Sequence, residues 1–154
     1  RISVVGGGRW ARTIASVLSG LLRPSDRITL HSPSNFPGLQ AWVTQPQFHG
    51  RLRAANVWPA VQAGQDQPDA IIIANRAGRH FAPAADALEN GIAVLVEKPV
   101  SLSARDVKRL SEIASAKGAV FAASHVLLFA RYFQAYAEAL QGVVRGDRPT
   151  VGAA

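Results

Sequence analysis

Short apolar runs alternate along the chain with segments in which apolar residues recur every three or four positions. The run at 2–5 is a short β-branched strand that ends in glycines. The runs at 70–74 and 92–96 lack the apolar–polar alternation of a half-exposed strand, so they are typical of parallel strands covered on both faces. We predict further strands at 28–30 and 119–123, and an extended piece near 52–57.

Helices are predicted between these strands. Apolar residues recur at helical spacing over about 11–22, 81–88, 107–114 and 129–140, and a shorter helix is predicted near 39–43. We expect Ser103 to cap its helix in a box with Asp106. The last helix is expected to carry Phe129, Tyr132 and Tyr136 on one face, packed either in the core or against a further domain. Strands alternating with helices predict an α/β fold, a doubly wound parallel sheet with right-handed crossovers.

A glycine-rich turn, GGGRWA at 6–11, follows the first strand and opens the first helix. It fits the pattern G-x-G-x-x-(G/A), in which Gly6 allows a sharp turn, Gly8 a close approach of pyrophosphate, and Ala11 close packing of helix on strand. The N–H groups at the helix start point at the anion. We predict a nucleotide-binding turn, although three glycines can also form only a loose turn. The predicted contacts are Gly6, Gly8, Arg9, Trp10 and Ala11.

No acidic residue follows the second strand, which continues as HSPSN over 31–35. In NAD-binding proteins an acid at this point binds the ribose 2′-hydroxyl. The hydroxyls of Ser32 and Ser34 and the amide of Asn35 can donate to a 2′-phosphate, which a carboxylate would repel. Two arginines at the start of the first helix, Arg9 and Arg12, are also within reach of such a phosphate. We therefore predict NADP(H) in preference to NAD(H). The alternative is that this segment is only a turn and helix cap.

Polar residues also follow the strands at 70–74 and 92–96, at the edge where open α/β sheets bind ligands. Asn75 is predicted to line the cofactor site, whereas Arg76 and Arg79 suit solvent and ligand equally. Glu97 and Lys98 are costly to bury without a use. We predict cofactor contact for both and a proton-transfer role for Lys98; the alternative is a surface ion pair.

Composition narrows the classes of protein. The 154 residues are 48% apolar and 18% charged, which suits one folded domain and excludes wholesale disorder. No apolar run reaches the roughly 18 residues of a membrane span. Cysteine is absent, which excludes disulfides, thiolate metal sites and a cysteine nucleophile. We predict no metal site. The net charge of +7 comes mostly from 14 scattered arginines, so nucleic acid ranks last among the candidate partners.

The chain contains no methionine and begins inside a predicted strand, so we expect it to be part of a longer protein. We predict an NAD(P)-binding domain at 1–125, a helix leading toward a C-terminal domain at 126–145, and the start of a truncated C-terminal segment at 146–154.

The ordered motifs resemble the N-terminal domain of the Gfo/Idh/MocA oxidoreductases (glucose-fructose oxidoreductase, inositol dehydrogenase, rhizopine catabolism). The segments concerned are VVGGGRWA at 4–11, DAIIIA at 69–74 with His80 beyond it, and VLVEKP at 94–99, of which Glu-Lys-Pro is the most specific. The resemblance implies a nicotinamide-dependent Rossmann domain followed by a substrate domain that mediates oligomerisation. It also implies a cis bond before Pro99, an active-site role for Lys98, and a secondary contact from His125.

Two departures from the family are visible. Asn75-Arg76-Ala77 stands where the family has Thr-Pro-Asn, and the Asp and His of the second domain have no counterpart in these residues. We expect an NADP(H)-dependent dehydrogenase that acts by hydride transfer on a sugar, cyclitol or related carbonyl or imine. We expect a small-molecule substrate as its partner, assembly into a homo-oligomer and a cytoplasmic location. We expect the 154 residues alone to be inactive. The alternative is a non-catalytic dinucleotide-binding or sensing module.

Overall fold

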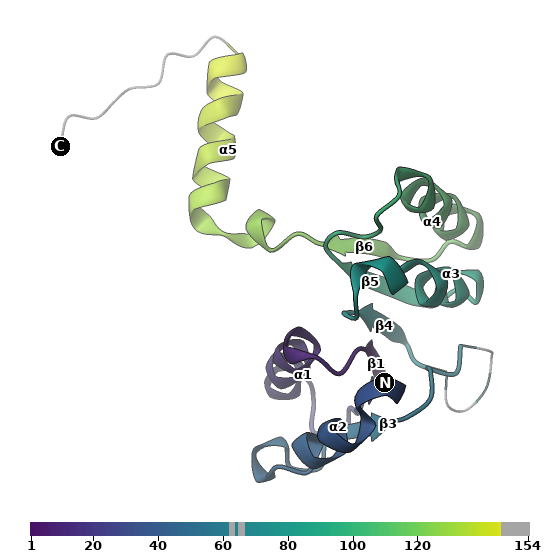
Figure 1. Ribbon diagram of the computed structural model, residues 1–154. Coiled ribbons are helices and arrows are strands. Elements are labelled where there is room, and N and C mark those ends of the chain that lie inside the picture. Colours follow the sequence, from purple (N-terminus) through teal and green to yellow (C-terminus); the bar gives the residue numbers. More distant parts are fainter. Residues whose placement is uncertain (62–63, 65–66, 146–154) are drawn as a thin grey trace, which may run out of the picture. The chain divides into compact units, whose positions relative to one another are not determined.

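Six parallel strands form one sheet in the computed structural model, which describes residues 1–61, 64 and 67–145. Their order is β3-β2-β1-β4-β5-β6 (Figure 1). The chain thus winds outward from β1 in one direction and from β4 in the other, so the strand order reverses between these two. This confirms the doubly wound parallel sheet. The strands are β1 (Ile2–Val5), β2 (Ile28–His31), β3 (Leu52–Ala55), β4 (Ala70–Ile73), β5 (Ala93–Glu97) and β6 (Phe121–Ser124).

Helices cover both faces of the sheet. On one face, α1 (Arg9–Leu21) and α2 (Phe36–Val43) pack on a core that includes Val4 and Ile72. On the other, α3 (Phe81–Glu89) and α4 (Ala104–Lys117) pack side by side on a core that includes Val5 (Figure 1). Neighbouring strand residues point to opposite faces, so a strand buried on both faces is mostly apolar at successive positions, as β4 (AIII) shows. Short 3-10 turns occur at Pro33–Asn35 (η1), Pro46–Phe48 (η2) and Ala77–Arg79 (η3).

Strand register brings the carboxyl ends of the central strands to one level. Val5 lies opposite both His31 and Ile73, and Ile73 lies opposite Val96. The residues that leave these strands therefore emerge together at one edge of the sheet. None of the helices in the described ranges is long and apolar enough to span a membrane.

Some local predictions were wrong. Ser103 does precede α4, but its hydroxyl makes no capping bond. Instead the Ser101 hydroxyl donates to Asp106 Oδ2 at 2.6 Å and accepts the Ser103 N–H at 3.1 Å, so Ser101 takes the carboxylate predicted for the capping box. The Lys98–Pro99 bond is cis, as the resemblance implied.

The chain divides into two compact units, Arg1–Ser124 and His125–Ala154, and the second is described as far as residue 145. It contains η4 (Val126–Phe129) and α5 (Arg131–Val144), with Ala130 in an extended conformation between them. Phe129 therefore lies outside the helix, contrary to prediction. No residue of α5 is buried, so core packing does not account for its aromatic residues. The segment predicted at 146–154 lies outside the described residues.

Candidate functional site

The glycine turn joins β1 to α1 in a conformation that requires glycine at its first position. Gly6 has φ = 139°, and a Cβ there would lie 2.8 Å from the Ala74 carbonyl oxygen. Ala11 is fully buried, so the small side chain lets α1 lie close to the turn. Gly8 caps α1 without any side-chain capping bond. The N–H groups of the first helical turn therefore have no intrahelical acceptor, and this free N-terminus suits an anion.

Gly7, to which the sequence analysis assigned no role, holds the turn against the segment that follows β2. Its carbonyl oxygen accepts hydrogen bonds from Arg12 Nε at 3.2 Å and from Asn35 Nδ2 at 3.1 Å. A Cβ on Gly7 would lie only 2.5 Å from Ser32 Oγ. The two segments thus meet at a distance that only a glycine permits.

Arg12 fixes this turn and does not line the cleft described below. Its guanidinium also donates to the Gly38 carbonyl oxygen at 3.1 Å and lies 5.5 Å from the centre of the Trp42 ring. These contacts engage the charged end of the side chain. The structure therefore gives Arg12 a packing role, and its predicted contact with a 2′-phosphate stays a prediction.

A cleft of about 630 Å³ opens at the carboxyl edge of the sheet, beside the point where the strand order reverses. It brings together most of the predicted cofactor residues, while Ala11 lies buried beneath it. Asn35, whose amide was predicted as a donor to a 2′-phosphate, also lines the cleft, whereas Trp58 was missed because it follows the irregular stretch after β3. The predicted residues in the lining are Gly6, Gly8, Arg9, Trp10, Ser32, Ser34 and Asn75.

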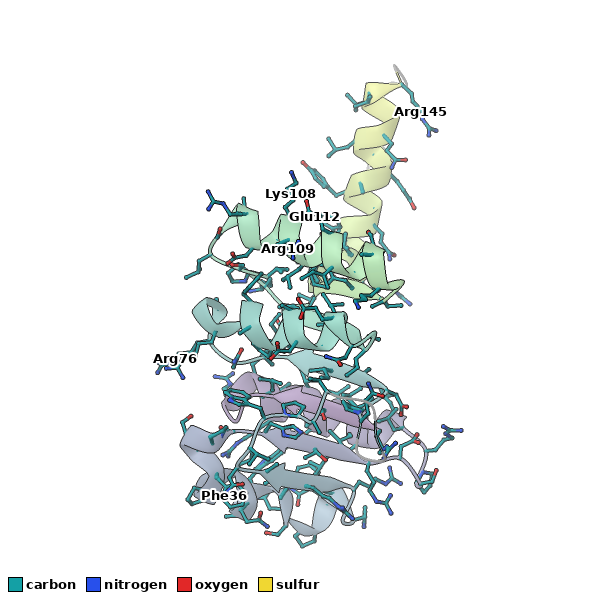
Figure 2. The ribbon with its side chains drawn as sticks, turned by 90° about the vertical axis from the view of Figure 1, so that its right-hand side faces the viewer. Phe36, Arg76, Lys108, Arg109, Glu112 and Arg145 are labelled. Atoms are coloured by element: carbon teal, nitrogen blue, oxygen red, sulfur yellow. The ribbon has the colours of Figure 1, made fainter. Side chains whose placement is uncertain are left out.

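The lining is suited to an anionic ligand. Arg9, Arg76 and Arg79 contribute positive charge, and none of the described residues that line the cleft is acidic. Figure 2 shows Arg76 extending outward from the edge where β4 ends. Asn75 Oδ1 is buried and has no hydrogen-bond partner among the described residues, so it offers a free acceptor for a ligand. The free N–H groups at the start of α1 and the arginines fit a dinucleotide phosphate, whereas the unpaired acceptor fits a ligand group that donates, such as a hydroxyl.

His31, at the end of β2, forms part of the cleft lining and was also missed. Its Nδ1 donates to the Val57 carbonyl oxygen at 2.9 Å, which leaves Nε2 to accept from the Ser3 hydroxyl at 3.1 Å. Burial lowers the pKa of His31, and the hydrogen bond to Val57 opposes this effect. The neutral ring therefore satisfies both partners. Those partners are far away along the chain, so no local sequence signal identifies them.

Glu97 and Lys98 lie at the end of β5, outside the cleft lining. The Glu97 carboxylate is buried and its Oε2 accepts the Lys98 backbone N–H at 3.3 Å, whereas Lys98 is exposed. Among the described residues no ion pair links the two side chains, so the ion-pair alternative does not hold. Strand register places Glu97 two strands from Gly6, or about 10 Å at the usual spacing. His125 is the first residue of the second unit, and its predicted contact with the substrate or cofactor stays a prediction.

Comparison with known proteins identifies the relatives of this chain. A family model described as "Oxidoreductase family, NAD-binding Rossmann fold" (Gfo/Idh/MocA) matches residues 1–125. A search of curated proteins found no significant match. Solved structures with the same fold include scyllo-inositol dehydrogenase from Lactobacillus casei with NAD(H) and scyllo-inositol bound, at 20% identity and a TM-score of 0.74.

Two further similar structures are complexes with NADP+ or NADP. Biliverdin reductase from Synechocystis, in complex with biliverdin and NADP+, is 26% identical with a TM-score of 0.70. A 3-ketoreductase from Actinomadura kijaniata, in complex with NADP and TDP-benzene, is 22% identical with a TM-score of 0.73. Each of the three comparisons covers 92% of this chain but only 41–42% of the other, so the chain spans about two fifths of their length. The match over residues 1–125 shows that the chain belongs to the Gfo/Idh/MocA oxidoreductase family, of which these residues form the NAD-binding Rossmann domain.

Proposed function

We propose that this chain is the cofactor-binding part of an NADP(H)-dependent oxidoreductase. The observation that carries the cofactor preference is the lining of the cleft, with three arginines, Ser32 and Ser34, and no acidic residue among those described. A carboxylate after β2 would accept hydrogen bonds from a ribose diol and repel a 2′-phosphate. Hydroxyl and guanidinium groups have the opposite preference because they donate to phosphate oxygens.

The residues present assign parts of the cleft to parts of the dinucleotide. The free N–H groups of α1 and the exposed backbone at Gly8 would hold the pyrophosphate. Ser32, Ser34 and Arg9 would hold the 2′-phosphate, and Asn75 Oδ1 would accept a hydrogen bond from the ligand. The nicotinamide ring, when bound, would supply the hydride acceptor or donor.

Lys98 is our candidate for the accompanying proton transfer. In reduction its ammonium group would donate a proton from Nζ to the substrate oxygen or nitrogen, and in oxidation the neutral amine would accept one. Its exposed side chain leaves the same edge of the sheet as the cleft. We propose a sugar, a cyclitol or a related carbonyl or imine as substrate. The similar dehydrogenase and ketoreductase structures support this class, and the remaining substrate contacts would come from a second domain.

Dissociation constants for NADPH and NADH test the cofactor proposal. We expect the 154-residue chain to bind NADPH at least tenfold more tightly than NADH. Replacing exposed Ser34 by aspartate should reverse that order, because the new carboxylate repels a 2′-phosphate but accepts from a 2′-hydroxyl. Ser34→Asn is the uncharged control of the same size. Tighter binding of NADH by the unmodified chain would overturn the proposal.

A further inference from the structure

His80 spans the gap between two loops at the carboxyl edge of the sheet. It is the residue before α3, and only 1% of its surface is exposed. Its Nε2 lies 3.0 Å from the carbonyl oxygen of Asn75, in the loop after β4. Its Nδ1 lies 3.0 Å from the carbonyl oxygen of Pro99, in the loop after β5. One imidazole ring therefore bridges the backbones of both loops.

The partners of His80 differ in kind from those of His31. A carbonyl oxygen can only accept, so a neutral His80 ring donates to one of its two partners and an imidazolium ring donates to both. His31 faces one carbonyl and one hydroxyl, which a neutral ring satisfies completely. His80 is thus placed as a donor between two acceptors. Among the described residues, no other hydrogen bond joins the loop after β4 to the loop after β5.

Each bridged loop carries a residue of the proposed site. Asn75 lines the cleft and its buried Oδ1 has no partner among the described residues, while its backbone oxygen contacts His80. Pro99 directly follows Lys98. Beyond Pro99 the loop is fastened to α4, because the Ser101 hydroxyl donates to Asp106 Oδ2 at 2.6 Å. The Lys98 loop is therefore held at one end by α4 and at the other by His80.

We propose that His80 is a positioning residue that couples occupation of the dinucleotide cleft to the placement of Lys98. This inference rests on the proposed function, because it requires a dinucleotide in the cleft and Lys98 beside the reacting group. A ligand donor that engages Asn75 fixes the loop after β4, and the imidazole transmits that constraint to Pro99. Without the bridge, the cleft keeps its own lining, but Lys98 is no longer held relative to it.

Lysine reactivity provides a direct readout, because the chain has three lysines: Lys98, Lys108 and Lys117. Lys108 and Lys117 are exposed on α4 and serve as internal references; Figure 2 shows Lys108 on the outer side of that helix. Trace acetylation of the chain, quantified by mass spectrometry, gives the labelling of Lys98 relative to these two. We expect saturating NADPH to reduce the relative labelling of Lys98 at least threefold.

Two variants at His80 test the bridge. In His80→Phe, which fills the space without a donor, we expect NADPH to bind within about threefold of its original Kd while at least half of the Lys98 protection is lost. His80→Asn keeps one amide donor and should retain intermediate protection. It also supplies the test if the Phe variant shows no cooperative melting. His49→Asn, at an exposed histidine far along the chain, is the control and should retain full protection.

The outcomes separate the two claims. NADPH binding with no protection of Lys98, or full protection in folded His80 variants, would overturn the positioning role and leave the cofactor proposal standing. A chain that binds neither NADPH nor NADH would overturn the proposed function, and the inference with it.

Discussion

The contact between Gly7 and Ser32 gives the sharpest prediction about the architecture of the cleft. Gly7→Ala would put a methyl group 2.5 Å from Ser32 Oγ and 2.6 Å from Ser32 Cβ, about 0.9 Å inside ordinary contact distance. Ser32 cannot swing into solvent, because it is only 6% exposed and its N–H donates to the Ala55 carbonyl oxygen. One segment must therefore shift, and overpacking of this kind costs about 1–3 kcal/mol of unfolding free energy.

The assay is urea unfolding followed by the fluorescence of the three tryptophans. Ser32→Gly removes both clashing atoms, so the double variant should be more stable than Gly7→Ala by about 1–2 kcal/mol after correction for Ser32→Gly alone. Gly20→Ala in α1 is the matched control. A Cβ at that position meets nothing within 4 Å, and alanine should stabilise the helix by up to about 1 kcal/mol. An unchanged unfolding midpoint in Gly7→Ala, or no recovery in the double variant, would refute the reasoning.

Two further predictions concern charge and protonation. In the longer polypeptide that we propose, Lys98→Ala should lower kcat/KM by about 10²–10⁴-fold and leave the Kd of NADPH within threefold; Lys108→Ala is the control, and an unchanged kcat/KM contradicts proton transfer by Lys98. The lowered pKa of His31 means that the unfolded chain binds its proton more readily. Above pH 6.5, the ordinary pKa of histidine, protonation of His31 should therefore not lower the free energy of unfolding. Below that pH the free energy of unfolding should fall by at most about 1.4 kcal/mol per pH unit. Urea unfolding at pH 8 and pH 5.5 should show a smaller loss for His31→Gln, and an equal loss would count against this.

The sequence predicted the central strands well because the pattern that marks a buried strand lies within a few consecutive residues. β4 is a continuous apolar run, and β1 is apolar apart from Ser3 and is followed by the glycine turn, which is the pattern of strands buried on both faces. The start of the last helix was harder to predict. Apolar residues at helical spacing begin at Phe129, but α5 begins only at Arg131. Helical periodicity does not show where the backbone leaves the helix.

For the site, the sequence predicted which residue types gather at the carboxyl edge, but not which of them fix the backbone. The glycine pattern placed Gly6 and Gly8 at the cleft because that motif is contiguous. The contacts of Arg12 with Gly38 and of His80 with Pro99 join positions many residues apart, and only the fold brings them together. The packing contacts of Arg12 were consequently not predicted, and His80 was not assigned a role at all.

The central claim is that the backbone at Gly8 holds the dinucleotide pyrophosphate. A Cβ at Gly8 would meet no protein atom within 4 Å, and its backbone is extended, so Gly8→Ala should cost the fold at most about 1 kcal/mol as a weaker helix cap. The methyl group would stand where the phosphates approach. The decisive measurement is the Kd of NADPH for Gly8→Ala against the unmodified chain. We predict binding at least about tenfold weaker, or about 1.4 kcal/mol, with the urea midpoint nearly unchanged; an equal Kd would contradict the account.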